Sequence, residues 1–288
     1  MIRSIIFTFF LSLLGLSSQR LAFSQSISSF TISPFTTQSF YIWCTDQNGT
    51  FVPYCTPTAT VGYYPFTGGH NHDDANHGVA ANEQISNITS NGQKNTNTVN
   101  ALIYFNASRI GEQEYVTVCA NTCTTATANV QYSGFQQLGS YSQFVKIGAT
   151  GIHPSNHWGT TSTLSSVVSI TGRYAADYSG VSRYQPVGVN DIALQGGGIF
   201  DICATPTSQP GKCVTAGYVP WQPPHNTHDF GTAVDFRANC GANSVLPAAY
   251  NDFVGYCQYY GLGRLAYLED KGKPNQHIHC DGNTIILQ

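Results

Sequence analysis

Charged residues are scarce in this chain, and no basic patch is present. Only 9% of the 288 residues are charged, with 12 Lys and Arg against 15 Asp and Glu. Proteins that bind nucleic acid or anionic membrane surfaces usually carry clustered basic residues. The composition therefore argues against a nucleic-acid partner. The abundant Ser, Thr, Asn, Gly and Tyr instead indicate a polar, weakly charged surface, as in many exported β-rich proteins.

Apolar runs long enough to span a bilayer are absent beyond the N-terminus. There, Arg3 precedes a short apolar stretch at residues 5–16, and small residues follow at 22–24. This order is typical of a secretory signal peptide, and the stretch is short for a membrane span. The alternative, an N-terminal anchor, is less favoured because the run ends in Ser-Ser-Gln-Arg. We predict that residues 1–24 are removed, which leaves a secreted protein with no membrane partner.

The nine cysteines lack the Cys-x-x-Cys spacing of a thiolate zinc site, so we do not interpret them as metal ligands. Their number instead fits an oxidising compartment. Short separations predict local disulfides, and three cysteines then remain, of which at most two can pair. A bridge between Cys240 and Cys280 would tie two motif-bearing segments together, and the alternative is that none of the three is bonded. The predicted local pairs are Cys44 with Cys55, Cys119 with Cys123, and Cys203 with Cys213.

Long helical periodicity is missing from residues 30–147, where short β-branched or alternating runs are separated by Gly, Asn and Thr. We predict a small all-β sandwich domain there. Its expected strands lie at residues 101–105, 115–119, 128–132 and 143–147.

The pattern changes after residue 148, where two stretches acquire helical periodicity. Residues 160–178 have apolar side chains at helical spacing after a Thr cap, and residues 244–260 have Ser244 as a cap and Gly261 as a stop. Apolar runs between and after them predict strands. We therefore expect an α+β domain over residues 150–288, with a small antiparallel sheet that carries several histidines.

One segment of this second domain, HNTHDFGTAVDF at residues 225–236, concentrates metal-binding side chains. His228 and Asp235 are seven residues apart, and a bend at Gly231 would let both point at one centre. Catalytic zinc usually takes three protein ligands from His, Asp or Glu and leaves one position open. The alternative interpretation of this run is a polar surface turn.

A second segment, QHIHCDG at residues 276–282, offers the missing ligand. His277 and His279 are two residues apart, so on a strand both face the same side. One of them can bind the metal, and the other can lie beside the bound water, where a proton carrier is needed. Two clusters on predicted strand edges favour a metal site over incidental surface histidines.

Together, HNTHDFGTAVD and the later HIH resemble a group of peptidoglycan metallopeptidases. The group comprises lysostaphin-type endopeptidases, D-alanyl-D-alanine peptidases and the penicillin-insensitive murein endopeptidase. NDIALQGGGIF at residues 190–200 also resembles a strand and Gly-rich turn of the last of these, and the similarity covers about residues 150–288. The resemblance implies a zinc-dependent hydrolase of peptide bonds in peptidoglycan cross-links or D-Ala-containing stems.

Carried onto this sequence, the resemblance implies that His228, Asp235 and His279 hold Zn²⁺. It implies that His277 is the catalytic base or transition-state stabiliser, and that His225 contacts the scissile group. The D-alanyl-D-alanine enzymes have an acidic base close to the last histidine. Here the nearest upstream acids are several residues away, which favours the endopeptidase-like arrangement and leaves the base assignment open.

Two further histidine clusters lie outside this site. GGHNHDDANHG, with His70, His72 and His77, is either a second metal site or a polar loop, and the loop is slightly favoured because Gly, Asn and Asp promote turns. His153 and His157, in HPSNHWGT, either line the cleft or pack at the domain junction.

Three other functions remain open. The domain can be a metal-binding recognition module without catalysis, a structural exported protein with incidental histidines, or a zinc hydrolase such as an amidase. A second histidine at position 277 argues against the first, since a purely structural site needs no extra one.

Overall fold

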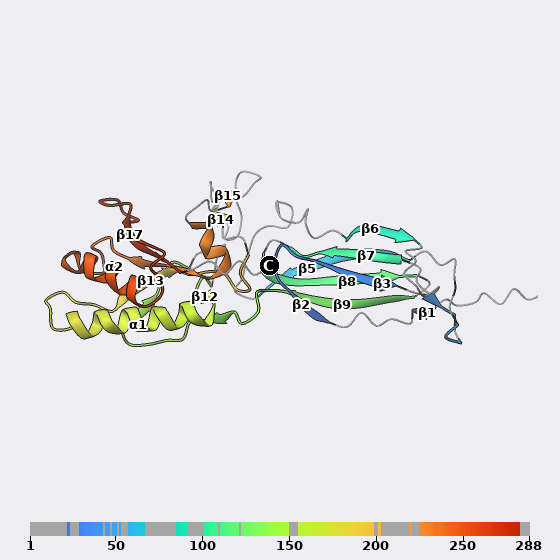
Figure 1. The fold of residues 1–288 in the computed structure, drawn as a ribbon, viewed down its shortest axis with the longest axis horizontal. Helices are drawn as coiled ribbons and strands as arrows, with labels where there is room; N and C mark the ends of the chain where they lie inside the picture. Colours follow the sequence, from blue (N-terminus) through green and yellow to red (C-terminus); the bar gives the residue numbers. More distant parts are fainter. Residues whose placement is uncertain are drawn as a thin grey trace, which may run out of the picture.

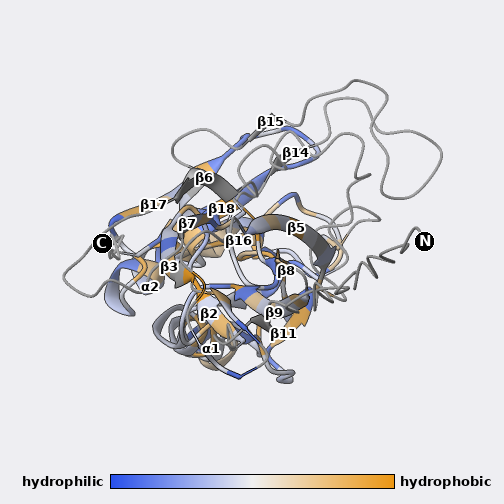
Figure 2. Cartoon of the chain, turned by 90° about the vertical axis from the view of Figure 1, so that its right-hand side faces the viewer, coloured by the Kyte–Doolittle hydropathy of each residue, from blue (hydrophilic) through white to orange (hydrophobic). Residues whose placement is uncertain are grey.

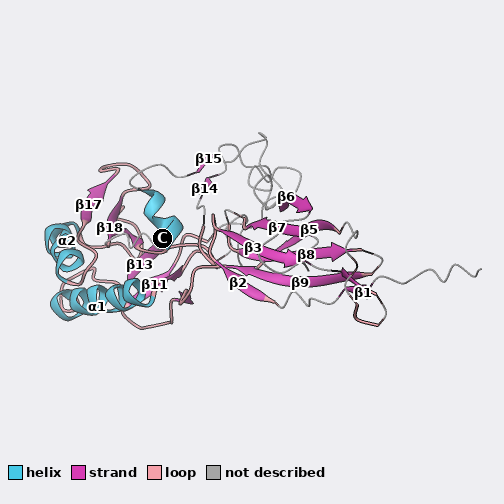
Figure 3. Ribbon diagram, turned by 45° about the vertical axis from the view of Figure 1, so that its right-hand side comes forward, coloured by secondary structure: helices cyan, strands magenta, loops and turns pink. Residues whose placement is uncertain are grey.

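Over the residues that it describes, the computed structural model has several small β-sheets and two α-helices in an elongated molecule (Figure 1). Both helices lie at the end opposite strand β1, as Figure 3 shows. Figure 2, which looks along the long axis, shows both hydrophilic and hydrophobic residues among the strands. The structure describes residues 22–23, 29–42, 44–46, 48–50, 52, 57–66, 85–90, 101–108, 110–120, 122–149, 155–198, 201–202, 219–220 and 225–282.

The N-terminal strands form two main sheets. The three-stranded sheet has the order β3-β7-β6, and the four-stranded sheet has the order β2-β9-β8-β5, with β2 parallel to β9 and its other pairs antiparallel. The strands are β2 (Phe30–Ile32), β3 (Thr37–Ile42), β5 (Thr58–Pro65), β6 (Ile85–Ser90), β7 (Ala101–Asn106), β8 (Glu112–Cys119) and β9 (Cys123–Val130). A two-stranded pair joins β1 (Ala22–Phe23) to β4 (Cys44–Thr45).

Burial alternates along β8, where every second residue is buried. Such alternation places one face of a strand against a core and the other toward solvent. Phe105, Val116 and Val118 belong to one buried apolar cluster contributed by these strands. The strands predicted at 101–105 and 115–119 are confirmed, and that predicted at 128–132 is the end of a longer strand, β9.

A five-stranded sheet forms the centre of the C-terminal half, in the order β11-β13-β16-β18-β17. Only the β11–β13 pair is parallel, so this sheet is mixed rather than purely antiparallel. Its strands are β11 (Phe144–Lys146), β13 (Val187–Asp191), β16 (Ala233–Arg237), β17 (Leu265–Glu269) and β18 (His277–Asp281). Two short pairs join β10 (Gln136–Gln137) to β12 (Trp158–Gly159), and β14 (Asp201–Ile202) to β15 (Val219–Pro220).

The strand expected at residues 143–147 is present as β11, but it does not join the N-terminal sheets. It pairs with β13, and Phe144 lies in the apolar cluster of the C-terminal half. The C-terminal sheet therefore begins before the boundary predicted at 147–150. The composition does not change until Gly148, so the sequence pattern could not place this short strand with its distant partner.

Helix α1 (Thr161–Tyr178) begins where the sequence predicts, with the side chain of Thr160 accepting a hydrogen bond from the backbone of Thr163. Helix α2 (Tyr250–Tyr259) is shorter than expected. A 3₁₀ turn, η4 (Pro247–Ala249), precedes it, and no side chain caps the N-terminus of η4 or of α2. Ser244 is not a cap, because its hydroxyl hydrogen-bonds to Asn239.

The two faces of the C-terminal sheet have different partners. Val234, Phe236 and Ile278 share a buried cluster with α1 and α2 residues, including Val167 and Phe253. Successive residues of a strand point to opposite faces. The residues between these apolar positions, which include Asp235, His277 and His279, therefore lie on the face away from the helices.

Disulfides occur in both halves. Cys119–Cys123 is confirmed, and Cys44 is disulfide-bonded, although its predicted partner Cys55 lies outside the described residues. The suggested Cys240–Cys280 bridge is wrong, because Cys280 of β18 is bonded to Cys257 of α2 and Cys240 is free and exposed. Cys280 faces the helices, whereas Cys240 lies beyond the end of β16. The pair Cys203 and Cys213 lies outside the described residues.

Within the described ranges, neither α-helix combines the length and the apolar character that crossing a bilayer requires. Most of the predicted signal peptide lies outside those ranges, apart from Ala22 and Phe23 in β1.

Candidate metal centre

Three neighbouring elements bring His228, Asp235 and His279 together in one buried group. His228 lies in the 3₁₀ helix η3 (His225–Phe230), Asp235 in β16 and His279 in β18. Asp235 and His279 are directly opposite each other in the antiparallel β16–β18 pair. Potential ligand atoms from the three residues all lie within 4.8 Å of one another. The group could therefore hold a metal ion.

The separations within this group fit a small divalent cation. His279 Nδ1 is 2.8 Å from Asp235 Oδ1, and His228 Nε2 is 3.5 Å from the same oxygen. Nitrogen and oxygen ligands bound tetrahedrally to zinc at roughly 2.1 Å lie about 3.4 Å apart. Small side-chain adjustments would bring these atoms to that spacing.

The turn between His228 and Asp235 requires glycine at position 231. Gly231 has a φ of +60°, in the left-handed region. A Cβ atom there would meet the ring of Phe135 and would lie 2.8 Å from Gly159 Cα. This bend reverses the chain between η3 and β16, so the residues that flank it can face one centre.

The orientation of His228 is set by the backbone of a neighbouring segment. Its Nδ1 is 2.6 Å from the carbonyl oxygen of Ile192, so Nδ1 carries the proton and donates it. The lone pair is then on Nε2, which is the atom nearer Asp235. Hydrogen bonding of one ring nitrogen to a carbonyl is the usual way in which metal-binding histidines are held.

Asp235 is only 4% exposed, yet it remains a carboxylate. Burial by itself raises the pKa of this group, but the attraction of His228, when that ring carries a second proton, and the hydrogen bond from His279 outweigh burial. The pKa of Asp235 consequently lies well below its usual value. The charged form is the one that binds metal.

His277 lies beside this group without being part of it. Its Nδ1 donates to the carbonyl oxygen of Asn275 at 2.8 Å, and its Nε2 lies 3.6 Å from Asp235 Oδ2. Burial lowers the pKa of His277, but the charge of Asp235 and the Asn275 carbonyl raise it more, so the net pKa is raised.

Glu269 is a member of this site that sequence spacing did not reveal. It is opposite His277 in the β17–β18 pair, and its Oε2 is 3.4 Å from His277 Nε2. Tyr267, two residues earlier on the same face, donates a hydrogen bond to Glu269 at 3.1 Å. Glu269 is eight residues upstream of His277 in the sequence, and strand pairing brings the two side chains together.

Asp191, in the motif NDIALQGGGIF, also lies close to the site. It pairs with Asp235 across β13 and β16, and the side chain of Asn156 hydrogen-bonds to it. Burial, followed by the charge of Asp235, raises the pKa of Asp191 to about 7. A fold-level pairing, rather than any local pattern, makes Asp191 a neighbour of Asp235.

Among the remaining predicted histidines, His157 is the one whose side chain the structure describes. The backbone of His225 lies in η3, but its side chain is outside the described residues, as are His70, His72, His77 and His153. His157 is 6% exposed, and its Nε2 donates to the Val189 carbonyl at 2.8 Å. His157 is thus a buried residue that packs beside β13.

Comparisons with known proteins add little to this geometry. No family model and no curated protein matches the sequence. One matching solved structure, described as the atomic resolution structure of titin domain M7, has a TM-score of 0.20 and 10% sequence identity. It covers 40% of this chain and 96% of that chain. We infer neither fold nor function from a likeness at this level.

Proposed function

We propose that the protein is an exported zinc hydrolase that cleaves amide bonds in peptidoglycan cross-links or D-Ala-containing stem peptides. The observation that carries the proposal is the buried His228, Asp235 and His279 group with His277 on the same strand face. A metal held only for stability would not need a further histidine and carboxylate beside it. The peptidoglycan substrate class rests on the resemblance of the two motifs.

The donor set suits zinc in a catalytic role. Two imidazoles and one carboxylate are the ligands of many catalytic zinc sites, which keep a fourth position open. When bound, Zn²⁺ polarises an amide carbonyl and lowers the pKa of water to about 7. His228 Nε2, Asp235 and His279 would hold the ion.

His277 would act as the proton carrier. Its Nδ1–H donates a hydrogen bond to the Asn275 carbonyl. Nε2 is therefore the atom that can accept a proton from water and return it to the leaving amine. Glu269 and Asp235 face this nitrogen at 3.4 and 3.6 Å and would stabilise the protonated ring. His225 would contact the scissile group, as the resemblance implies.

We also propose that the chain is divided into two domains. The N-terminal strands would form a β-sandwich domain and the five-stranded sheet with α1 and α2 a metallopeptidase-like domain. The two separate apolar clusters support this division. Disulfides support an extracytoplasmic location, since such bonds persist in oxidising compartments.

The test is hydrolysis of defined muropeptides by the purified, zinc-loaded protein. Cross-linked dimers and stem pentapeptides would be incubated with wild type and with His277→Ala. The products would be identified by mass spectrometry. We expect cleavage by wild type only, with monomers indicating endopeptidase action and released D-Ala indicating carboxypeptidase action. Zinc binding without cleavage of either substrate would favour a recognition module instead.

A further inference from the structure

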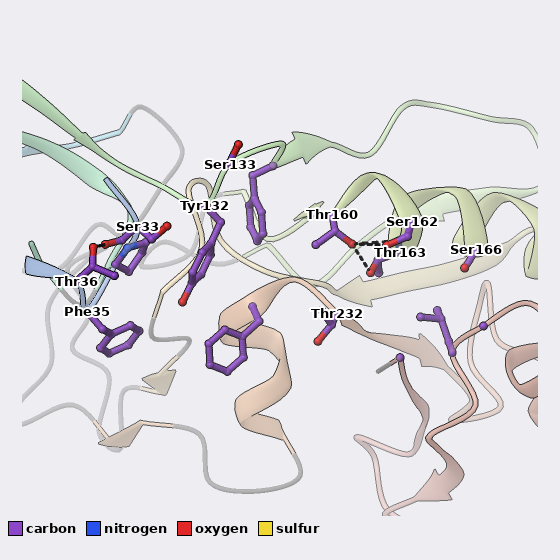
Figure 4. Close-up of a pocket in the computed structure, with 16 residues that line it drawn as sticks. Ser33, Phe35, Thr36, Tyr132, Ser133, Thr160, Ser162, Thr163, Ser166 and Thr232 are labelled. Carbon is purple, nitrogen blue, oxygen red and sulfur yellow. Dashed lines mark hydrogen bonds between the residues drawn. The ribbon is translucent and has the colours of Figure 1, made fainter. Parts of the chain in front are cut away.

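A cavity of about 820 Å³ opens where the N-terminal strands meet the first turns of α1 (Figure 4). Its walls come from the turn after β2, the segment after β9, the start of α1, the end of η3, the residue before β16, and the residues that follow α2 and β18. The volume lies within the range of small-molecule binding sites. Figure 4 shows Phe35 and Tyr132 on one side and Thr160, Ser162 and Thr163 on the other.

The cavity is separate from the candidate metal centre. Thr232, which lines it, is in phase with Val234 and Phe236, whose side chains pack toward the helices. Asp235 and His279 lie on the opposite face of the sheet. A ligand in this cavity would therefore be on the other side of the sheet from the buried histidines.

No charged side chain occurs among the described residues that line the cavity, whereas nine of the sixteen carry a hydroxyl group. Burying a charged ligand group without an opposite charge is costly. The lining therefore favours an uncharged ligand.

Several of these hydroxyl groups already donate their hydrogen within the protein. Ser166 donates to the Tyr260 carbonyl at 2.6 Å, and Thr232 donates to the Thr227 carbonyl at 3.2 Å. What each still offers to a ligand is an oxygen lone pair. The matching ligand is uncharged and brings its own O–H donors, which a hydrocarbon chain does not.

Four aromatic rings complete the lining. The ring of Tyr132 lies 5.6 Å from that of Phe135 and 5.8 Å from that of Phe230, measured between centroids. Phe35 is 47% exposed and has a φ of +65°, a conformation uncommon for a bulky residue. Flat apolar rings beside hydroxyl oxygens are complementary to a sugar, which has apolar C–H faces and hydroxyl edges.

We propose that this cavity binds an uncharged oligosaccharide. The proposal does not depend on the hydrolase function, because the cavity and the histidine group lie on different faces of the sheet. A neutral glycan held there would anchor the protein to a polysaccharide while the opposite face stays accessible.

The test is saturation-transfer NMR of the full protein with three neutral probes, chitotetraose, cellotetraose and maltotetraose, and with octanol as an apolar probe. Phe35→Ala removes an exposed ring, and Ser162→Trp fills the cavity from an exposed helix position. Tyr259→Ala is the matched control, since Tyr259 is 82% exposed and does not line the cavity. Circular dichroism and zinc uptake would verify that each variant is folded.

We expect at least one saccharide to bind wild type and Tyr259→Ala equally, and to lose at least tenfold in affinity in both cavity variants. Zinc uptake should be unchanged in all of them. Absence of binding by all three saccharides would overturn the proposal, as would binding that survives both cavity substitutions or binding of octanol alone. None of these outcomes would count for or against the proposed metal centre.

Discussion

Asp235 and His279 face each other across two antiparallel strands, with 2.8 Å between Asp235 Oδ1 and His279 Nδ1. The pair is buried, and His228 approaches the same carboxylate oxygen from the turn before β16. Strand register holds the first two residues rigidly, while the glycine bend sets the third. A site whose ligands come from paired strands is pre-organised, which favours metal binding over a polar turn.

Metal should stabilise the folded protein measurably. A ligand that binds only the native state at 100 times its dissociation constant adds about 2.7 kcal/mol to the free energy of unfolding. We expect zinc to raise the melting temperature of chelator-treated wild type in calorimetry. Asp235→Asn should show little rise, and Tyr259→Ala, whose side chain is exposed, should respond like wild type. Equal responses in all three proteins would place the metal elsewhere.

Removing His277 should separate metal binding from turnover. General base catalysis typically contributes about 10² to 10⁴ in rate. His277→Ala should therefore retain zinc but lose at least a hundredfold in kcat on muropeptides. Full activity of His277→Ala would exclude it as the base.

Glu269→Gln should change the pH dependence of the reaction. The charges of Asp235 and Glu269 both contribute to the raised pKa of His277. A base must be unprotonated, so activity falls as the pH drops below its pKa. Removing the Glu269 charge lowers that pKa, and the acidic limb of the kcat profile should move to lower pH. An unshifted limb would show that Glu269 does not act on the titrating base.

The Cys257–Cys280 bridge should stabilise the strand that carries His277 and His279. The bond closes a sequence separation of 23 residues. Chain entropy predicts roughly 3 kcal/mol from a loop of this size. Replacing both cysteines by alanine should lower the free energy of unfolding in urea by about that amount. Cys240→Ser, at a free and exposed position, should leave it unchanged. Equal stability of all three proteins would contradict this assignment.

Protonation of His157 should lower the stability of the folded protein in acid. Burial is the main reason why the pKa of His157 is lowered from 6.5 to about 4. The unfolded state therefore binds the proton first, and stability is lost as the pH falls from 6.5 toward 4. The limiting loss is about 3 kcal/mol. In His157→Gln, urea titrations of chelator-treated protein should show a correspondingly shallower decline over this window than in wild type. Parallel declines would show that His157 does not titrate as described.

Local sequence patterns predicted the elements better than their partners. The Thr cap and periodicity placed α1 to within a residue, and Gly261 does follow the end of α2. Strand β17 was not anticipated, and β11 was expected with the wrong sheet, because three to five residues carry little periodicity. Pairing between distant strands is a tertiary property that no local window contains.

The same distinction applies to the site. His228, Asp235, His277 and His279 stand out because their spacing is visible along the chain. Glu269 and Asp191 become neighbours only through the registers β17–β18 and β13–β16. The mistaken Cys240–Cys280 suggestion has the same origin, since sequence proximity to a ligand does not show which sheet face a side chain occupies.

The most direct test is the metal content of the protein purified without chelator, measured by elemental mass spectrometry. The matched variants are His228→Ala, which removes a ligand, and His157→Gln, which replaces a buried histidine outside the group. We predict about one zinc per chain in wild type and in His157→Gln, and none in His228→Ala. No zinc in wild type even after titration, or the same zinc content in His228→Ala, would contradict the metal centre.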